Sequence, residues 1–197
     1  MLATVSALTL LLLAPGPTNT LLLRAGVLFG LRASWKLAFI ECLAYLLQVS
    51  VWGVALLYLA AYSPWAVKLI QLAASTYLLW VSWRLWRGAK ALDGVGRDRF
   101  TSSYFFWMTV MNPKGLLIAS LIAPPDTFTY WTGYLAFMCT MVLVVVPIGS
   151  AWIVFGAGVV GRGRHLLSPR VINRSAALAI GFFATVLLGR LVTSILP

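Results

Sequence analysis

The chain has 197 residues, of which 61% are hydrophobic and 10% are charged, and its formal net charge is +11. A soluble domain of this length lacks the interior volume to bury so many apolar side chains, so the composition excludes an ordinary soluble protein and favours a lipid environment. The positive charges occur in three short clusters between apolar runs, which fits topology signals and anionic lipid headgroups better than nucleic acid.

Six apolar runs are long enough for membrane-spanning helices, each of which needs roughly 20 residues. In chain order they are about 2–23, 36–60, 65–84, 103–123, 130–156 and 175–195. No basic segment precedes the first run, and Pro-Gly-Pro stands where a signal peptide would be cleaved, so we expect this run to be a membrane helix. The sequence predicts an all-α integral membrane protein with six transmembrane helices in a single domain, 1–197.

The connections between these runs alternate in charge. The first, third and fifth carry basic clusters that include Arg24, Arg84 and Arg162, whereas the second and fourth carry no Lys or Arg. Because basic connections stay in the cytoplasm, both chain ends of this multi-pass protein are predicted to lie outside. The alternation also supports the count of six spans, since a missed span would place a basic connection on each side.

The chain divides into two halves of three predicted spans, 1–90 and 103–197, joined by a basic cytoplasmic loop at 91–102. Because each half has an odd number of spans, the two insert with opposite orientation, which predicts an inverted repeat. Each half opens with a span interrupted by proline and continues to a span with one cysteine, Cys42 or Cys139. Interrupted helices at matching places in inverted repeats indicate a transporter's binding site.

The first interruption is PGPTN, at 15–19. Pro15 and Pro17 each remove a backbone donor, and the freed carbonyl groups must be satisfied by protein or cavity water, so this segment is expected to face the bundle interior. A simple proline kink is the alternative. If Pro17 begins a new helix, the N–H groups of Thr18, Asn19 and Thr20 have no partner within it. The predicted substrate-binding residues here are Pro15, Gly16, Pro17, Thr18 and Asn19.

The second interruption is MNPKG, at 111–115. Asn112 is a favoured N-cap and Pro113 a favoured first helical residue, so the following N–H groups are predicted to be free. Lys114 places a full charge near the middle of its span, at a cost of roughly 2.5–3.5 kcal/mol. Two positive helix ends and this ammonium group predict a site for a small carboxylate. Alternatively, Lys114 satisfies the carbonyl groups freed by the first break, and the two roles can coexist.

Glu41 lies inside the second predicted span and shares one helix face with Tyr45 and Gln48. An acidic residue within a membrane span is by default a functional hypothesis. Glu41 could bind a substrate ammonium group, relay a proton or pair with Lys114, and we include Glu41 and Gln48 among the predicted substrate-binding residues. The alternative is an ion pair at the inner interface with a basic residue, namely Arg24, Arg32 or Lys36.

Other polar or helix-bending residues in the spans favour structural roles. Lys68 stands near the outer end of the third span, where its ammonium group can reach the interface. Gln71 and Ser75 are typical of hydrogen bonds between membrane helices. Pro147 and Gly149 predict a kink in the fifth span, which could act as a gate or allow close packing.

Four segments of the sequence, PGPTN in the first span, YLLWVSWRL at 77–85, MNPKGLL at 111–117 and APP at 123–125, resemble the LysE/RhtB family of bacterial amino-acid exporters. The resemblance extends over the whole chain in length, span count and motif order. It implies an exporter in the bacterial inner membrane driven by the proton gradient. The motif positions that carry over are Pro15, Gly16, Pro17, Asn19, Asn112, Pro113 and Lys114.

The chain departs from the family pattern at two places. Gln71 stands where the family usually has a lysine, and Glu41 and Cys42 stand where it usually has glycines. Both changes affect the expected pathway, so the substrate of another member cannot be transferred to this chain.

The sequence as a whole predicts a secondary active exporter of amino acids or related small carboxylate-bearing metabolites, and not an enzyme. Its expected partners are the substrate, protons and membrane lipids, and it could form a homodimer. Nucleic acid is not an expected partner. No cofactor or metal is expected. The alternatives are a transmembrane thiol relay through Cys42 and Cys139, and a metal-ion exporter, for which one histidine and two separated cysteines provide too few ligands.

Overall fold

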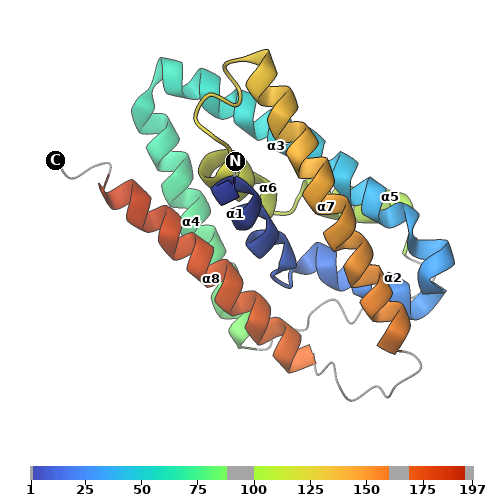
Figure 1. The fold of residues 1–197 in the computed structure, drawn as a ribbon. Coiled ribbons are helices and arrows are strands. Elements are labelled where there is room, and N and C mark those ends of the chain that lie inside the picture. The colour runs from blue at the N-terminus through green and yellow to red at the C-terminus, as the bar shows by residue number, and fades with distance from the viewer. Residues whose placement is uncertain (1, 88–99, 160–168, 194–197) are drawn as a thin grey trace.

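The computed structural model describes residues 2–87, 100–159 and 169–193, and these residues form helices and turns with no strand among them. Residues 91–99 of the predicted basic loop lie outside the described residues. The helices follow the chain from α1 to α8 (Figure 1). Their bounds are α1 Leu2–Leu13, α2 Pro17–Ser34, α3 Lys36–Tyr62, α4 Pro64–Trp86, α5 Ser102–Val110, α6 Lys114–Leu117, the π-helix η2 Ile118–Ile122, α7 Trp131–Val159 and α8 Pro169–Thr193.

Two of these helices, α3 and α7, are individually long and apolar enough to cross a membrane. Two bent pairs also meet this condition when each is taken as one span: α1 with α2, bent by 60°, and α5 with Lys114–Ile122, bent by 44°. The apolar part of α8, Ala177–Thr193, is shorter. The chain is therefore a helical membrane protein with two to four clear spans, and the finer division into six inverted spans stays a prediction.

The predicted break in the first span is confirmed between α1 and α2. Gly16 is the N-cap residue of α2 in an extended conformation, and Pro17 is the first helical residue. One detail of the prediction is wrong: the Thr20 N–H group donates to the Gly16 carbonyl oxygen at 2.9 Å. The N-cap carbonyl accepts the first bond of the helix, which leaves fewer N–H groups available than expected.

The predicted end of the first span near residue 23 is also wrong. Helix α2 continues to Ser34, so Arg24 lies inside a helix, and only Trp35 separates α2 from α3. Arginine is a good helix former and does not end a helix. The one departure from helical backbone within α2 is Gly30, with φ 73° and ψ 174°, a conformation that favours glycine because a side chain there meets its own backbone.

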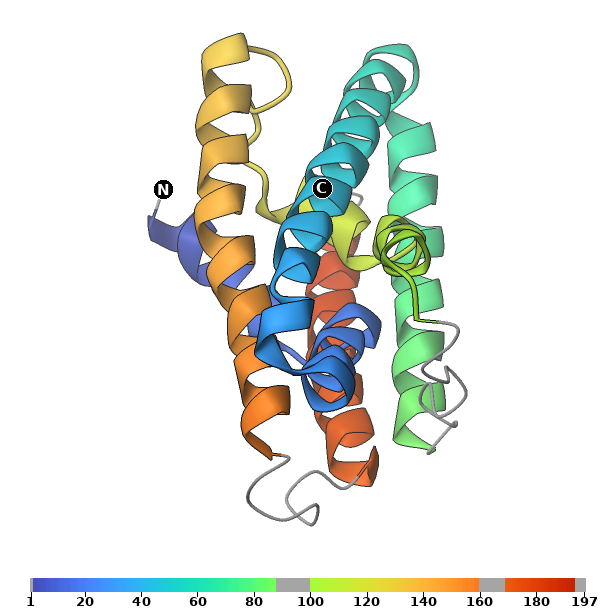
Figure 2. The same ribbon diagram turned by 90° about the vertical axis from the view of Figure 1, so that its right-hand side faces the viewer.

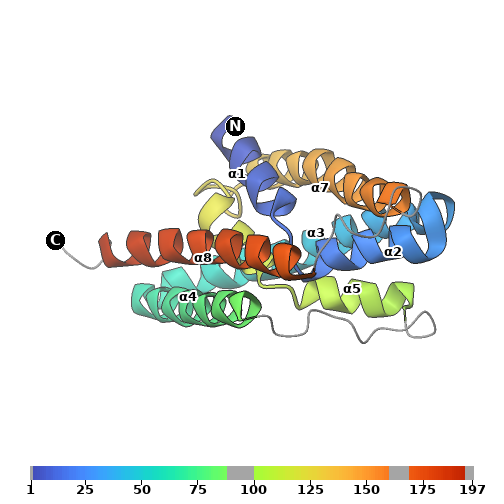
Figure 3. The same ribbon diagram turned by 90° about the horizontal axis from the view of Figure 1, so that it is seen from below.

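Helices from different predicted halves pack along one another. Helix α2 lies along α7 and α4 lies along α8 (Figures 1 and 3). Glycines permit the first contact, since a Cβ atom on Gly26 would meet the Ile153 carbonyl oxygen and one on Gly156 would meet that of Leu23. Helix α7 runs unbroken through Pro147, so the structure does not divide the helix there.

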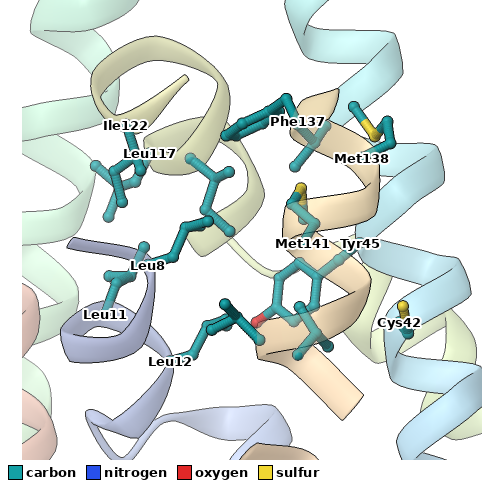
Figure 4. Packing of buried hydrophobic residues seen from close by; sticks show 14 of the residues in the cluster. Leu8, Leu11, Leu12, Cys42, Tyr45, Leu117, Ile122, Phe137, Met138 and Met141 are labelled. Carbon is teal, nitrogen blue, oxygen red and sulfur yellow. The ribbon is translucent and has the colours of Figure 1, made fainter. Parts of the chain in front are cut away.

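Helix α3 occupies a central position between α7 and α4 (Figure 2). Next to it, leucine side chains of α1 pack against Leu117, Ile122 and Met141 in one apolar cluster (Figure 4). Tyr45 of α3 lies in the same cluster (Figure 4). The two helix breaks are therefore held against the face of α3 that carries Tyr45.

Candidate functional site

The two helix breaks meet in the interior of the protein. The Lys114 ammonium group donates a hydrogen bond to the Ala14 carbonyl oxygen at 2.7 Å, and Lys114 is only 1% exposed. Gly16 makes room for this side chain, because a Cβ atom there would lie 3.1 Å from Lys114 Cε and 3.2 Å from Nζ. The predicted alternative for Lys114, that it satisfies a carbonyl group freed by the first break, is thus what the structure contains.

Asn19 provides two further hydrogen bonds at the end of α1. Its amide nitrogen donates to the Leu12 carbonyl oxygen at 2.6 Å and to that of Ala14 at 2.9 Å. The break thus faces the bundle interior, as predicted, and protein groups satisfy these carbonyl groups. The Ala14 oxygen consequently has two donors, Asn19 and Lys114.

Asn112 connects the second break to two other helices. Its side-chain Nδ2 atom donates to the Thr18 hydroxyl at 3.0 Å and to the Tyr45 hydroxyl at 3.1 Å. Its backbone carbonyl oxygen accepts from Gln48 Nε2 at 2.6 Å. The Asn112 side-chain oxygen accepts from the Lys114 backbone N–H at 3.1 Å. The N-cap residue of α6 is Pro113, one residue after the predicted Asn112, and the Asn112 side chain accepts from the first residue of the helix.

The prediction of free N–H groups after Pro113 is wrong for the two residues that follow it. Asn112 accepts from both, through its side chain for Lys114 and through its backbone carbonyl for Gly115, at 3.2 Å. The helix that follows, α6, has only four residues before η2. The Lys114 charge, rather than a helix dipole, is consequently the main positive feature of this side of the site.

The face of α3 predicted from the residue spacing points into the site. Glu41, Tyr45 and Gln48 are all buried. The Glu41 carboxyl group interacts with Thr18 and, through space, with Lys114, while its Oε1 atom has no hydrogen-bond partner. An ion pair of Glu41 with Arg32 or Lys36 is not favoured, because both basic residues are exposed whereas Glu41 is 2% exposed.

The predicted site residues thus gather at one place, with the prolines shaping the backbone and the polar side chains lying between the breaks. Sequence reasoning left out Tyr45, although its spacing from Glu41 placed it on the same face. It also left out Gly149, where a Cβ atom would lie 2.6 Å from Glu41 Oε2. This contact joins residues that are far apart in the sequence, so no local pattern reveals it.

A separate cavity of about 560 Å³ lies between α1, α3, α4, η2 and α8. Gln71 and Arg190 are among its lining residues, and Arg190 donates to the Leu121 carbonyl oxygen at 3.3 Å. None of the predicted site residues lines it. With Lys114, Asn19 and Asn112 all at most 2% exposed, the site between the breaks is closed to solvent in this conformation.

Neither alternative function gains support from the described residues. They contain no group of three His, Cys, Asp or Glu side chains placed to hold a metal ion. Cys42 is buried in α3 and Cys139 is exposed on α7, and neither forms a disulfide.

The fold and the site define a helical membrane protein with a charged, buried junction between two broken helices. Comparison with family models, curated protein sequences and solved structures found no match to this chain.

Proposed function

We propose that the protein is a secondary active exporter of amino acids or related small carboxylate-bearing metabolites across the bacterial inner membrane, coupled to protons. One observation supports this most directly: a lysine ammonium group is buried where two broken helices meet. A charge at this depth is expensive, and a protein that only needed a stable bundle would have no use for it. The resemblance to the LysE/RhtB exporters points in the same direction.

The hydrogen bonds at Ala14 support an exchangeable role for Lys114. The Ala14 oxygen also accepts from Asn19, so Lys114 can leave it without creating a buried carbonyl group that lacks a donor. A substrate carboxylate could take the place of the Ala14 oxygen at the ammonium group, with a stronger charge-assisted bond. The closed conformation would then be the empty or resting form of the site.

The order of the elements agrees with the inverted repeat on which this proposal rests. A broken helix followed by two long helices occurs first as α1 to α4 and again as α5 to α8. In this arrangement the basic connections face the cytoplasm and both chain ends face outward, as the sequence predicts.

Counterflow into proteoliposomes tests the proposal. Vesicles containing the purified full chain are loaded with each of the twenty unlabelled L-amino acids in turn, and uptake of the same labelled amino acid is followed. We expect uptake for at least one amino acid, loss of that uptake in Lys114→Met, and its retention in Lys68→Met. Lys68 is a matched control because its ammonium group lies over the Trp65 ring, 4.9 Å from the ring centroid. Full uptake by Lys114→Met would show that Lys114 does not bind the substrate. If the parent protein took up no amino acid, the proposed export of amino acids would be refuted.

A further inference from the structure

Glu41 is the only acidic residue in the predicted membrane spans. The chain has four acidic residues, and the others, Asp93, Asp98 and Asp126, stand in the third and fourth connections. Any carboxyl group that carries a proton through the membrane interior of this protein must therefore be that of Glu41.

The surroundings of Glu41 come from several elements and leave one oxygen without a partner. Thr18 of α2 and Lys114 of α6 interact with its carboxyl group, and Cys42 and Tyr45 of α3 also sense its charge. From α7, Gly149 presents only backbone, with the Cβ position 2.6 Å from Oε2. The Oε1 atom is buried and accepts no hydrogen bond.

We propose that the Glu41 carboxyl group holds either a proton or the ammonium group of a zwitterionic amino acid, and never both, while Lys114 holds the carboxylate of the same amino acid. This inference rests on the proposed export function and deepens it in two respects. It narrows the substrate class to zwitterions, and it assigns proton coupling to one residue.

The argument starts from the unpartnered oxygen. An ionised carboxylate with a buried oxygen that accepts no hydrogen bond is strongly unfavourable, so the closed site favours a cation on Glu41. Lys114 acts on Glu41 only through space, since the hydrogen bond of its ammonium group is to the Ala14 carbonyl oxygen and Glu41 Oε1 accepts none. A proton is the cation that fits a site closed to solvent.

A zwitterionic amino acid provides a second way to neutralise the Glu41 carboxyl group. When its carboxylate binds Lys114, its ammonium group is brought to the neighbouring Glu41, which must release its proton to form the ion pair. On the cytoplasmic side the amino acid enters and the proton leaves, and on the outer side the amino acid leaves and a proton enters. One proton then moves inward for each amino acid exported.

Proton release on binding tests this exchange without a transport assay. The purified full chain in detergent, in weakly buffered solution with a pH indicator, is mixed with the amino acid that gives the largest counterflow, and separately with its 2-hydroxy acid analogue. We expect release of about one proton per protein molecule with the amino acid and none with the analogue, which lacks the ammonium group. Glu41→Gln should release none, whereas Asp126→Asn, the same carboxyl-to-amide change at an exposed position, should behave as the parent.

Transport by the same variants gives the second measurement. For one coupled proton, a gradient of one pH unit should increase accumulation of the amino acid by up to about tenfold in the parent and in Asp126→Asn. In Glu41→Gln this dependence should disappear, and the preference for the amino acid over the 2-hydroxy acid should be lost.

Three outcomes overturn the inference. The first is binding of the amino acid to the parent without proton release, a result that decides the matter even if Glu41→Gln does not fold. The second is gradient-driven accumulation by Glu41→Gln equal to that of the parent. In both cases the export function stands, whereas a parent protein that transports no amino acid would overturn both proposals.

Discussion

Gly156 of α7 is the position where a single methyl group should do most harm to the packing of the bundle. A Cβ atom there would meet the Leu23 carbonyl oxygen of α2 and would lie 2.8 Å from the Leu23 carbonyl carbon and 3.1 Å from its Cα atom. All three are backbone atoms, which cannot rotate away. Gly156→Ala should therefore push α2 and α7 apart along their contact.

The magnitude follows from two opposing effects. Alanine within a helix is more stable than glycine by about 0.5–1 kcal/mol, whereas overpacking of a close contact costs about 1–3 kcal/mol. Gly158 on the same helix has no atom within 4 Å of its Cβ position, so Gly158→Ala gains the first effect without the second. The two variants should differ in free energy of unfolding by about 1–3 kcal/mol, with Gly158→Ala the more stable.

Equilibrium unfolding of the purified protein measures this difference. Mixed micelles are titrated with sodium dodecyl sulfate while the helical circular dichroism signal is followed, and free energies are compared at one detergent composition. Gly26→Ala, on the α2 side of the same contact, should resemble Gly156→Ala. Equal stability of Gly156→Ala and Gly158→Ala would refute the close approach of α2 and α7.

Three further predictions concern the region between the breaks and the thiols. Asn19→Leu should lower the free energy of unfolding by about 1–3 kcal/mol, measured in the same titration, because a buried carbonyl group at the end of α1 loses its donor; an unchanged value would contradict this role. Gly115→Ala should be destabilised by contact with the Gln48 side chain, and Gln48→Ala should partly rescue it in a double-mutant cycle; purely additive effects would argue against the contact. A maleimide reagent should label Cys139 in detergent much faster than Cys42, compared in variants that retain one cysteine each, because only Cys139 is exposed; equal rates would show that α3 is placed incorrectly.

The parts of the fold that the sequence predicted well depend on local chemistry. Proline cannot continue a helix as other residues do, so both breaks were placed correctly, and the third span, predicted from 65, begins one residue earlier at Pro64. The bond from the Lys114 N–H group to the Asn112 side chain reflects the preference of asparagine for helix starts, although the N-cap residue is Pro113. The inward face of α3 could be predicted because helical spacing places Glu41 and Gln48 on one side.

The parts that the sequence did not predict depend on tertiary contacts or on weak local signals. The extension of α2 through Arg24 was missed because a charged residue was taken as the end of a span, although it does not interrupt a helix. The Lys114–Ala14 bond joins the two helix breaks, which are far apart in the sequence, and the sequence left it as one of two roles. Glu41 and Gly149 meet only because α3 and α7 pack together, which no single segment of the sequence encodes.

The close fit of α2 against α7 has a consequence for how the site can open. Backbone meets backbone at Gly26 and Gly156, so sliding or tilting within the pair would be resisted there. Between α2 and the second break, by contrast, the polar connections are side-chain bonds, from Asn112 to Thr18 and from Lys114 to Ala14 just before α2, beside apolar packing of Phe105. We therefore expect α2 and α7 to move together as one unit in any opening of the site, which would break the side-chain bonds of Asn112 and Lys114.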